Sequence, residues 1–252
     1  MPADAPTVLA TSGGYQAGAG GRRRLDFAPL VRHAVDLSGV HGRAPRVLYL
    51  GTAQGDQRSG AADIDEAARA AGLSLQHLHL FPMPNHPDLE ALVLDQDVVW
   101  VGGGSVANLL AVWRVHGLDA VFGRAWLAGV ELAGVSAGSI CWHSGGTTDS
   151  YGPDLRAVTD GLALLPWGNG VHYDSEPRRR PLIHRLVAEG VLPRTYCTDD
   201  GAGLVYRGTE LAEVVTERRG ALGYLVERDP ATGRPVETPL PTRLLAPPSF
   251  SS

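Results

Sequence analysis

Ser136 is the residue of this chain best placed to act as a nucleophile. It is the centre of a Gly-Val-Ser-Ala-Gly pentapeptide, residues 134–138, which directly follows the largely apolar residues 130–133. In a nucleophile elbow, the serine lies in a sharp turn between a strand and a helix. Small residues on either side of the serine leave room for the strained backbone of this turn. The pattern therefore predicts that the Ser136 hydroxyl stands exposed at the end of a buried strand.

His172 is the predicted base for this nucleophile. A serine hydroxyl is a weak nucleophile until a base within hydrogen-bond reach takes its proton. Of the nine histidines, six precede Ser136 in segments where a core or surface role fits better. His143 follows Ser136 on the same predicted helix, and His184 lies inside a predicted amphipathic helix. His172 ends a short strand-like segment and is followed by a polar stretch, so it is expected at the carboxyl edge of a sheet.

A catalytic histidine also needs a carboxylate that orients its ring. The loop between Ser136 and His172 offers three, Asp149, Asp154 and Asp160. Asp149 lies in a Gly- and Thr-rich polar segment that can fold back over the elbow, whereas Asp160 begins an ordinary Asp-Gly turn. The predicted triad is therefore Ser136, His172 and Asp149.

Two backbone amides are predicted to stabilise a negatively charged oxygen at this site. One is the amide of Ala137, because it starts the helix behind the nucleophile, where amides point outward. The other comes from the glycine run at residues 102–104, which follows a strand and precedes a helix, with Gly103 as the expected donor. The run also fits a tight strand-to-helix turn or a phosphate-binding loop. However, no lysine follows it as in a Walker loop, and its spacing is not Gly-x-Gly-x-x-Gly.

The elements that must position these residues alternate between apolar runs and helix-length segments. Strands are predicted at residues 7–10, 46–51, 73–81, 97–101 and 130–135, and helices at residues 27–37, 61–71, 88–94 and 105–115. This βαβα alternation predicts a single-domain α/β fold with a mostly parallel, doubly wound sheet. The strand that contains His77 and His79 alternates in polarity, which indicates an edge position.

The second half of the chain is predicted to be more irregular. After Ser136 we expect a short helix to about residue 143, a polar loop over 144–160, a strand over 170–173 and a helix over 181–189. Consecutive β segments follow between residues 194 and 227. We assign residues 1–228 to one α/β domain. Residues 229–252 are predicted to be a Pro-rich tail that is extended and partly disordered.

Composition excludes several classes of protein. The net charge of −5 and the lack of a basic stripe argue against nucleic-acid binding. The only two cysteines, Cys141 and Cys197, do not have the spacing of a zinc site or a disulfide framework. No signal peptide and no apolar run of about 18 residues is present, so we expect a soluble, cytoplasmic protein that does not bind membranes. We also expect no cofactor and no metal, and a monomer or small homo-oligomer.

Three segments together carry a family resemblance. They are residues 98–110 (Val-Val-Trp-Val-Gly-Gly-Gly-Ser-Val-Ala-Asn-Leu-Leu), residues 134–139 (Gly-Val-Ser-Ala-Gly-Ser) and residues 170–174 (Gly-Val-His-Tyr-Asp). Their order and spacing, over roughly residues 7–225, resemble the peptidase E family of serine aspartyl dipeptidases and the related cyanophycinases. An α/β-hydrolase also has a Gly-x-Ser-x-Gly elbow, but its histidine normally follows the last strands of a longer chain. No histidine follows His184 here, which disfavours that fold.

The resemblance implies a flavodoxin-like fold, similar to that of class I glutamine amidotransferases, with serine where those enzymes carry cysteine. It also implies that Ser136 is the nucleophile, that His172 is the base, and that a carboxylate of the intervening loop completes the triad. Asp149 matches an aspartate that follows a Thr-Thr pair in the dipeptidases, with a one-residue gap.

The implied activity is a serine peptidase that hydrolyses short peptides, including dipeptides with an N-terminal aspartate, through an acyl-enzyme. Arg178 and Arg179 fall in the segment that holds the aspartyl side chain in the dipeptidases, although the match is loose. A guanidinium can grip a carboxylate through two parallel hydrogen bonds. The same arginines also fit a solvated helix start beside Glu176. Two alternatives stay open, a cyanophycinase-like amide hydrolase and a non-catalytic, amidotransferase-like binding protein.

Overall fold

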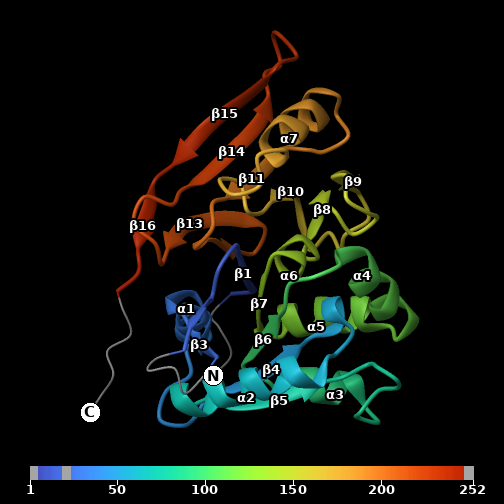
Figure 1. Ribbon diagram of the computed structural model, residues 1–252, viewed down its shortest axis with the longest axis vertical. Coiled ribbons are helices and arrows are strands. Elements are labelled where there is room, and N and C mark those ends of the chain that lie inside the picture. The colour runs from blue at the N-terminus through green and yellow to red at the C-terminus, as the bar shows by residue number, and fades with distance from the viewer. Residues whose placement is uncertain (1–4, 19–23, 247–252) are drawn as a thin grey trace.

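The computed structural model describes residues 5–18 and 24–246, which form two large β-sheets with helices around them (Figure 1). The larger sheet has eight strands, in the spatial order β16 (Thr242–Leu244), β13 (Glu210–Thr216), β12 (Ala202–Arg207), β1 (Thr7–Thr11), β7 (Glu131–Val135), β6 (Val98–Val101), β4 (Arg46–Leu50) and β5 (Ser74–Leu78). The smaller sheet has six, in the order β15 (Pro235–Leu240), β14 (Gly223–Arg228), β11 (Thr195–Thr198), β10 (Leu165–Gly170), β8 (His143–Thr148) and β9 (Arg156–Val158). A hairpin pairs β2 (Tyr15–Ala17) with β3 (Leu25–Phe27).

The helices of the described residues are α1 (Pro29–Leu37), α2 (Arg58–Ala71), α3 (Leu89–Leu94), α4 (Val106–Val115), α5 (Leu118–Leu127), α6 (Ala137–Ile140) and α7 (Arg179–Ala188), with a single 3₁₀ turn η2 (Thr52–Gln54). In this part of the chain, none of them is long and apolar enough to cross a membrane. Helix α5 is absent from the sequence prediction, although it buries residues such as Phe122 and Trp126.

Strands β1, β7, β6, β4 and β5 form the parallel part of the larger sheet, and helices cover both of its faces. Along β6, Val99 and Val101 pack into a core with α3, α4, α5 and α6, whereas Val98 and Trp100 pack into a second core with α1 and α2. Alternate residues of one strand thus serve two cores, as expected for a parallel strand buried on both sides. The α/β, mostly parallel, doubly wound sheet is confirmed, and β5 lies at its edge as its alternation predicted.

The smaller sheet includes segments that the sequence predicted as a loop. Residues 144–160 contain most of β8 and all of β9, and His143 begins β8 instead of ending a helix. A Cβ atom at Gly145 would lie 2.2 Å from the Val158 carbonyl oxygen, and one at Gly146 would lie 2.3 Å from the Asn169 carbonyl oxygen. Strands that pack this closely need glycine, and glycine carries no hydrophobic pattern from which a strand can be predicted.

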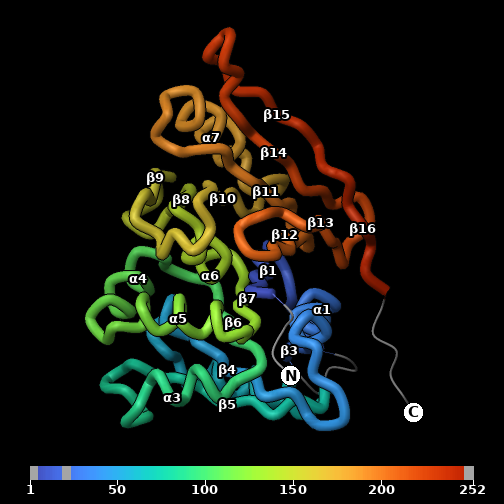
Figure 2. The backbone as a smooth tube through the Cα atoms, turned by 180° about the vertical axis from the view of Figure 1, so that it is seen from behind, coloured from blue at the N-terminus to red at the C-terminus, as the bar shows by residue number. Residues whose placement is uncertain are grey.

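The C-terminal segment joins both sheets. Strand β15 pairs with β14 at the edge of the smaller sheet, and β16 pairs with β13 at the edge of the larger one (Figure 2). The sequence set residues 229–252 apart as a partly disordered tail, but residues 235–240 and 242–244 form ladder pairs, and residues 247–252 lie outside the described part. Prolines 235 and 239 are compatible with β15 because an edge strand has one unpaired side.

Candidate active site

The turn at Ser136 has the backbone of a nucleophile elbow. Ser136 lies between β7 and α6 with φ 58° and ψ −112°, a left-handed φ that is rare for a residue with a side chain. Its amide donates a hydrogen bond of 3.0 Å to the Thr11 carbonyl oxygen at the end of β1. The strand, turn and helix that the pentapeptide predicts are therefore all present, and they present a half-buried serine.

The two glycines of the pentapeptide are required by close backbone contacts. A Cβ atom at Gly134 would lie 2.4 Å from the Gly138 carbonyl oxygen, and one at Gly138 would lie 2.2 Å from the Val101 carbonyl oxygen. Both distances are far inside van der Waals contact, so larger residues would push the elbow away from β6. The glycines thus allow Ser136 to approach the loop that follows β6.

Gly103 in that loop lies directly against Ser136. A Cβ atom built on Gly103 would be 3.2 Å from Ser136 Cβ and 3.8 Å from its Oγ. The neighbouring Gly102 amide is bonded to the Leu50 carbonyl at 3.0 Å, whereas the Gly103 amide donates no hydrogen bond within the described residues. Ala137 is the first residue of α6, so its amide has no acceptor inside the helix. Both predicted oxyanion donors are thus unpaired amides beside Ser136.

His172 is held at the end of β1, the strand that also binds the Ser136 amide. Strand β10 ends at Gly170, and His172 follows in a turn with φ 53°. Its amide donates to Ser12 Oγ at 3.1 Å, and Ser12 Oγ in turn shares a 2.6 Å hydrogen bond with Thr198 Oγ1. Thr11 holds the amide of Ser136 and Ser12 holds the amide of His172. Two consecutive residues at the end of β1 therefore place both groups.

Asp200, and not Asp149, is the carboxylate on the His172 ring. His172 Nδ1 lies 2.5 Å from Asp200 Oδ1, and both side chains are partly exposed. If Nδ1 carries the proton and donates it to the carboxylate, Nε2 is left as the basic nitrogen. Within the described residues, neither Ser136 Oγ nor His172 Nε2 makes a hydrogen bond. Such contacts are commonly long in free enzymes and tighten when substrate binds.

A second set of contacts fixes Asp200. Its amide donates to Asp174 Oδ1 at 2.8 Å, its carbonyl accepts from Arg218 Nε at 2.9 Å, and Arg218 forms an ion pair with Asp174. Burial disfavours the ionised form of Asp174, but the hydrogen bonds from the Asp200 amide and from Arg218 outweigh it, so the pKa of Asp174 is lowered. An ionised Asp174 thus holds the backbone of Asp200 in place.

The sequence prediction missed Asp200 because it searched only the loop between the serine and the histidine. Asp160 in that loop pairs with Arg114 on α4, and Asp149 is exposed just beyond β8, near Arg179. Neither the predicted Asp149 nor the other two candidates of the loop, Asp154 and Asp160, forms a hydrogen bond or ion pair with His172. The available signal was the Asp-Asp-Gly turn at residues 199–201, which follows the buried strand β11.

The two predicted substrate-binding arginines lie in different environments. Arg178 is exposed and paired with Glu176 at 3.1 Å, which is the solvated helix start that the sequence left open. Arg179 is 7% exposed. Its Nη1 donates to the Thr147 carbonyl at 2.6 Å, its Nε has no partner, and within the described residues it forms no ion pair. Burial lowers the pKa of Arg179, although the nearby charges of Asp149 and Glu176 act in the opposite direction.

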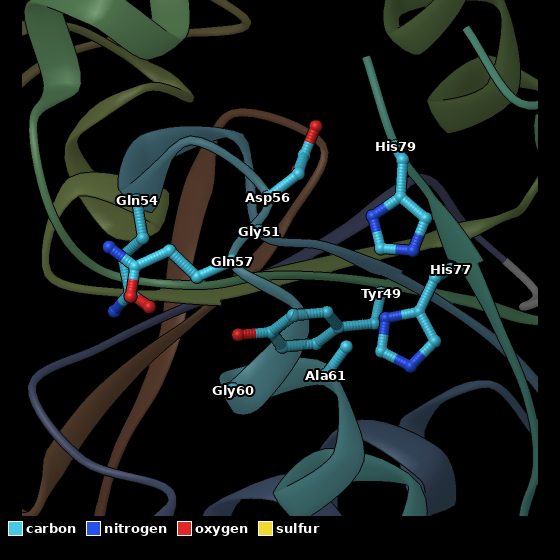
Figure 3. Close-up of a pocket in the computed structure, with 9 residues that line it drawn as sticks. All are labelled: Tyr49, Gly51, Gln54, Asp56, Gln57, Gly60, Ala61, His77 and His79. Carbon is cyan, nitrogen blue, oxygen red and sulfur yellow. The ribbon is translucent and has the colours of Figure 1, made fainter. Parts of the chain in front are cut away.

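A separate pocket lies across the glycine run from Ser136, at the ends of β4 and β5 (Figure 3). Cβ atoms built on Gly102 and Gly104 would lie 2.7 Å from Tyr49 Oη and 3.1 Å from Gln54 Cγ. In Figure 3 the Tyr49 hydroxyl points toward the glutamines and away from the two histidines. The pocket is lined by Tyr49, Gly51, Gln54, Asp56, Gln57, Gly60, Ala61, His77 and His79. Among the described residues, no group of three or more His, Cys, Asp or Glu side chains is arranged to hold a metal ion.

Comparison with known proteins shows the family of this chain. The model of peptidase family S51 matches residues 17–214. The chain belongs to peptidase family S51. It is 39% identical over 201 residues to the Bacillus subtilis (strain 168) protein named Uncharacterized peptidase YgaJ, covering 80% of this chain and 85% of that protein. The family resemblance drawn from the three sequence segments is thereby confirmed, and the protein is a peptidase.

Solved structures agree with the fold. A peptidase from an acI-B1 Actinobacterium matches with a TM-score of 0.66 at 15% identity, over 94% of this chain and 95% of that one. A candidate peptidase E protein from Listeria monocytogenes EGD-e matches with a TM-score of 0.57 at 18% identity, over 81% of this chain and 96% of that one. At these identities the likeness concerns the fold, which is flavodoxin-like.

Proposed function

We propose that this family S51 member is a serine peptidase that cleaves short peptides through an acyl-enzyme. The observation that carries the proposal is the combination of a serine on a strained elbow with a His172–Asp200 pair anchored to the same strand end. Serine, histidine and carboxylate in this relation form the constellation that activates a hydroxyl for attack on a carbonyl carbon.

The chemistry follows from the roles of these groups. His172 Nε2 takes the proton of Ser136 Oγ as the oxygen attacks the scissile carbonyl, and Asp200 stabilises the imidazolium that forms. The amides of Ala137 and Gly103 receive the resulting oxyanion. The C–N bond then breaks, and Nε2 gives its proton to the leaving amine. Water, deprotonated by His172, hydrolyses the ester and restores the Ser136 hydroxyl.

Arg179 supports a preference for substrates with an acidic N-terminal residue. It is a buried cation that forms no ion pair within the described residues and interacts electrostatically with Asp200, whereas Arg178 is paired with Glu176. A substrate carboxylate would supply the partner that the Arg179 guanidinium lacks, and a neutral side chain would leave the guanidinium unpaired. We therefore infer that dipeptides with an N-terminal aspartate are the preferred substrates.

The direct test combines a labelling experiment with a dipeptide screen. A fluorophosphonate probe should label the wild-type protein at Ser136 and should not label Ser136→Ala. The screen should show hydrolysis of Asp-X dipeptides. A protein that neither labels nor hydrolyses any peptide would contradict the enzyme proposal and favour the non-catalytic alternative. Labelling without dipeptide turnover, but with cleavage of an aspartyl-arginine polymer, would favour the cyanophycinase-like alternative.

A further inference from the structure

Glu237 of strand β15 accepts hydrogen bonds from residues 173–184, which follow His172. Its carboxylate is 17% exposed and accepts from Tyr173 Oη at 2.7 Å and from His184 Nε2 at 2.8 Å. Arg180 Nη1 forms an ion pair with its other oxygen at 2.5 Å. Burial disfavours ionisation, but the hydrogen bonds from Tyr173 and His184 outweigh it, and the pKa of Glu237 is lowered. Glu237 is thus an ionised acceptor at the centre of three donors.

One of these donors is the immediate neighbour of the proposed base. Tyr173 is 2% exposed, and its amide donates to the Thr198 carbonyl at 3.1 Å. The Arg180 guanidinium lies 4.4 Å from the centre of its ring. Tyr173 is therefore held at its backbone by β11 and at its hydroxyl by Glu237. Because a planar peptide joins it to His172, the position of Tyr173 constrains where His172 lies.

Strand β14, which pairs with β15, contacts the residue that precedes Asp200. The Tyr224 hydroxyl on β14 donates to Asp199 Oδ2 at 3.3 Å, and Asp199 directly precedes Asp200. The Arg180 guanidinium also lies 4.8 Å from the centre of the Tyr224 ring. Both views place β14 and β15 alongside α7, which carries Arg180 (Figures 1 and 2). Strands β14 and β15 thus contact the neighbours of both His172 and Asp200.

We propose that Glu237 is a positioning residue for catalysis: through Tyr173 it holds His172 in register with Ser136. The proposal rests on the serine-peptidase function. Strands β14 and β15 lie beyond residue 214, where the family match ends. This chain therefore supports its base with a segment outside the part that it shares with the family model.

The test is Glu237→Gln, which keeps the size of the side chain but removes the charge that its three donors require. We expect kcat to fall by about tenfold to a hundredfold with KM changed by less than about twofold, because displacement of a catalytic group by about 1 Å can cost a hundredfold. The rate of fluorophosphonate labelling at Ser136 should fall in step. The matched control is Glu227→Gln on β14, where the carboxylate pairs with Arg194 at the surface. It should leave kcat unchanged.

Tyr173→Phe provides a second variant, because it removes only the hydroxyl that donates to Glu237. The effects of Glu237→Gln and Tyr173→Phe on kcat should be strongly non-additive if both act through one contact. A kcat of Glu237→Gln within twofold of wild type would overturn the proposal. An equal loss in Glu227→Gln, or a loss that disappears once rates are scaled to the folded fraction, would also overturn it. Should Ser136→Ala remain active, the peptidase mechanism itself fails, which is a separate result.

Discussion

The serine half and the histidine half of the site are held by different kinds of contact. Around Ser136 and Gly103, the contacts are between backbone atoms. The closest of them require glycine, because there is no room for a Cβ atom. Around His172 and Asp200, the contacts are hydrogen bonds and ion pairs made by side chains from distant segments, such as that of Arg218, which binds the Asp200 carbonyl and the Asp174 carboxylate. The turn at Ser136 is thus positioned by steric fit, whereas the side chains of His172 and Asp200 are positioned by hydrogen bonds and ion pairs.

This contrast suggests that the two halves fail in different ways when they are changed. On the serine side, added atoms should displace the elbow. On the histidine side, removed charges should leave the fold standing but loosen the base. The variants below test this difference, from the largest expected effect to the smallest.

The largest effect is expected for Ser136→Ala. Loss of a triad serine costs about 10⁴-fold or more in kcat, and the removal of one oxygen at a half-buried turn should leave the thermal unfolding of the protein unchanged. Hydrolysis of a cleaved dipeptide is the measurement. Residual activity above about 1% of wild type would contradict the role of Ser136 as the nucleophile.

The next effect separates the two candidate carboxylates. Asp200→Asn should lower kcat by about 10³- to 10⁴-fold, because the amide favours the wrong tautomer of His172. Asp149→Asn is the matched control and should stay within a few fold of wild type. The reverse ranking would return the role to Asp149 and would show that the loop closes over the elbow when substrate binds.

Arg179→Met tests whether the histidine half also selects the substrate. Wild type should prefer Asp-Leu over Ala-Leu by roughly 10²-fold in kcat/KM, and Arg179→Met should erase that preference. The control is Arg178→Met, which removes a solvated cation and should preserve it. Equal turnover of both dipeptides by wild type would exclude aspartyl specificity while leaving the serine-peptidase mechanism intact.

The smallest effect is expected for the free energy of unfolding, through the buried His143 next to α6. His143 is buried, Nδ1 lies 2.9 Å from the Ser139 carbonyl oxygen of α6, and burial lowers its pKa from 6.5 to about 4. Between these values the unfolded chain binds a proton that the folded chain does not, so the free energy of unfolding falls as the pH drops. This one group should remove about 2 to 3 kcal/mol between pH 7 and pH 4.5.

Denaturant unfolding of wild type and His143→Gln at both pH values measures this term. The difference in stability between pH 7 and pH 4.5 should be smaller in the variant, because glutamine does not take up the proton. An identical pH dependence in the two proteins would assign the acid sensitivity to other groups.

The parts of the fold that depend on local sequence were predictable. Hydrophobic patterning placed the five parallel strands, and the steric need for glycine at Gly134 and Gly138 marked the elbow. Asp200 was missed because chain order does not show which strands are neighbours: His172 follows β10 and Asp200 follows β11, and these two strands pair in the smaller sheet. Glu237 was missed because a polar, Pro-containing edge strand has no pattern that distinguishes it from a tail. The residues that could be predicted, His172 included, are marked by the local sequence, whereas the missed carboxylates Asp200 and Glu237 are brought into place by long-range contacts.

The end of β1 has a consequence for moving this site to another protein. Thr11 pairs with Val135 on one side and with Gly203 on the other, and the next residue, Ser12, carries the hydroxyl that receives the His172 amide. Successive strand residues face opposite sides, so a slip of one residue would turn the Ser12 hydroxyl away. A graft that transplanted only Ser136, His172 and Asp200 would therefore lose the two residues that fix their relative positions. Such a graft has to include the dipeptide Thr11-Ser12 as well.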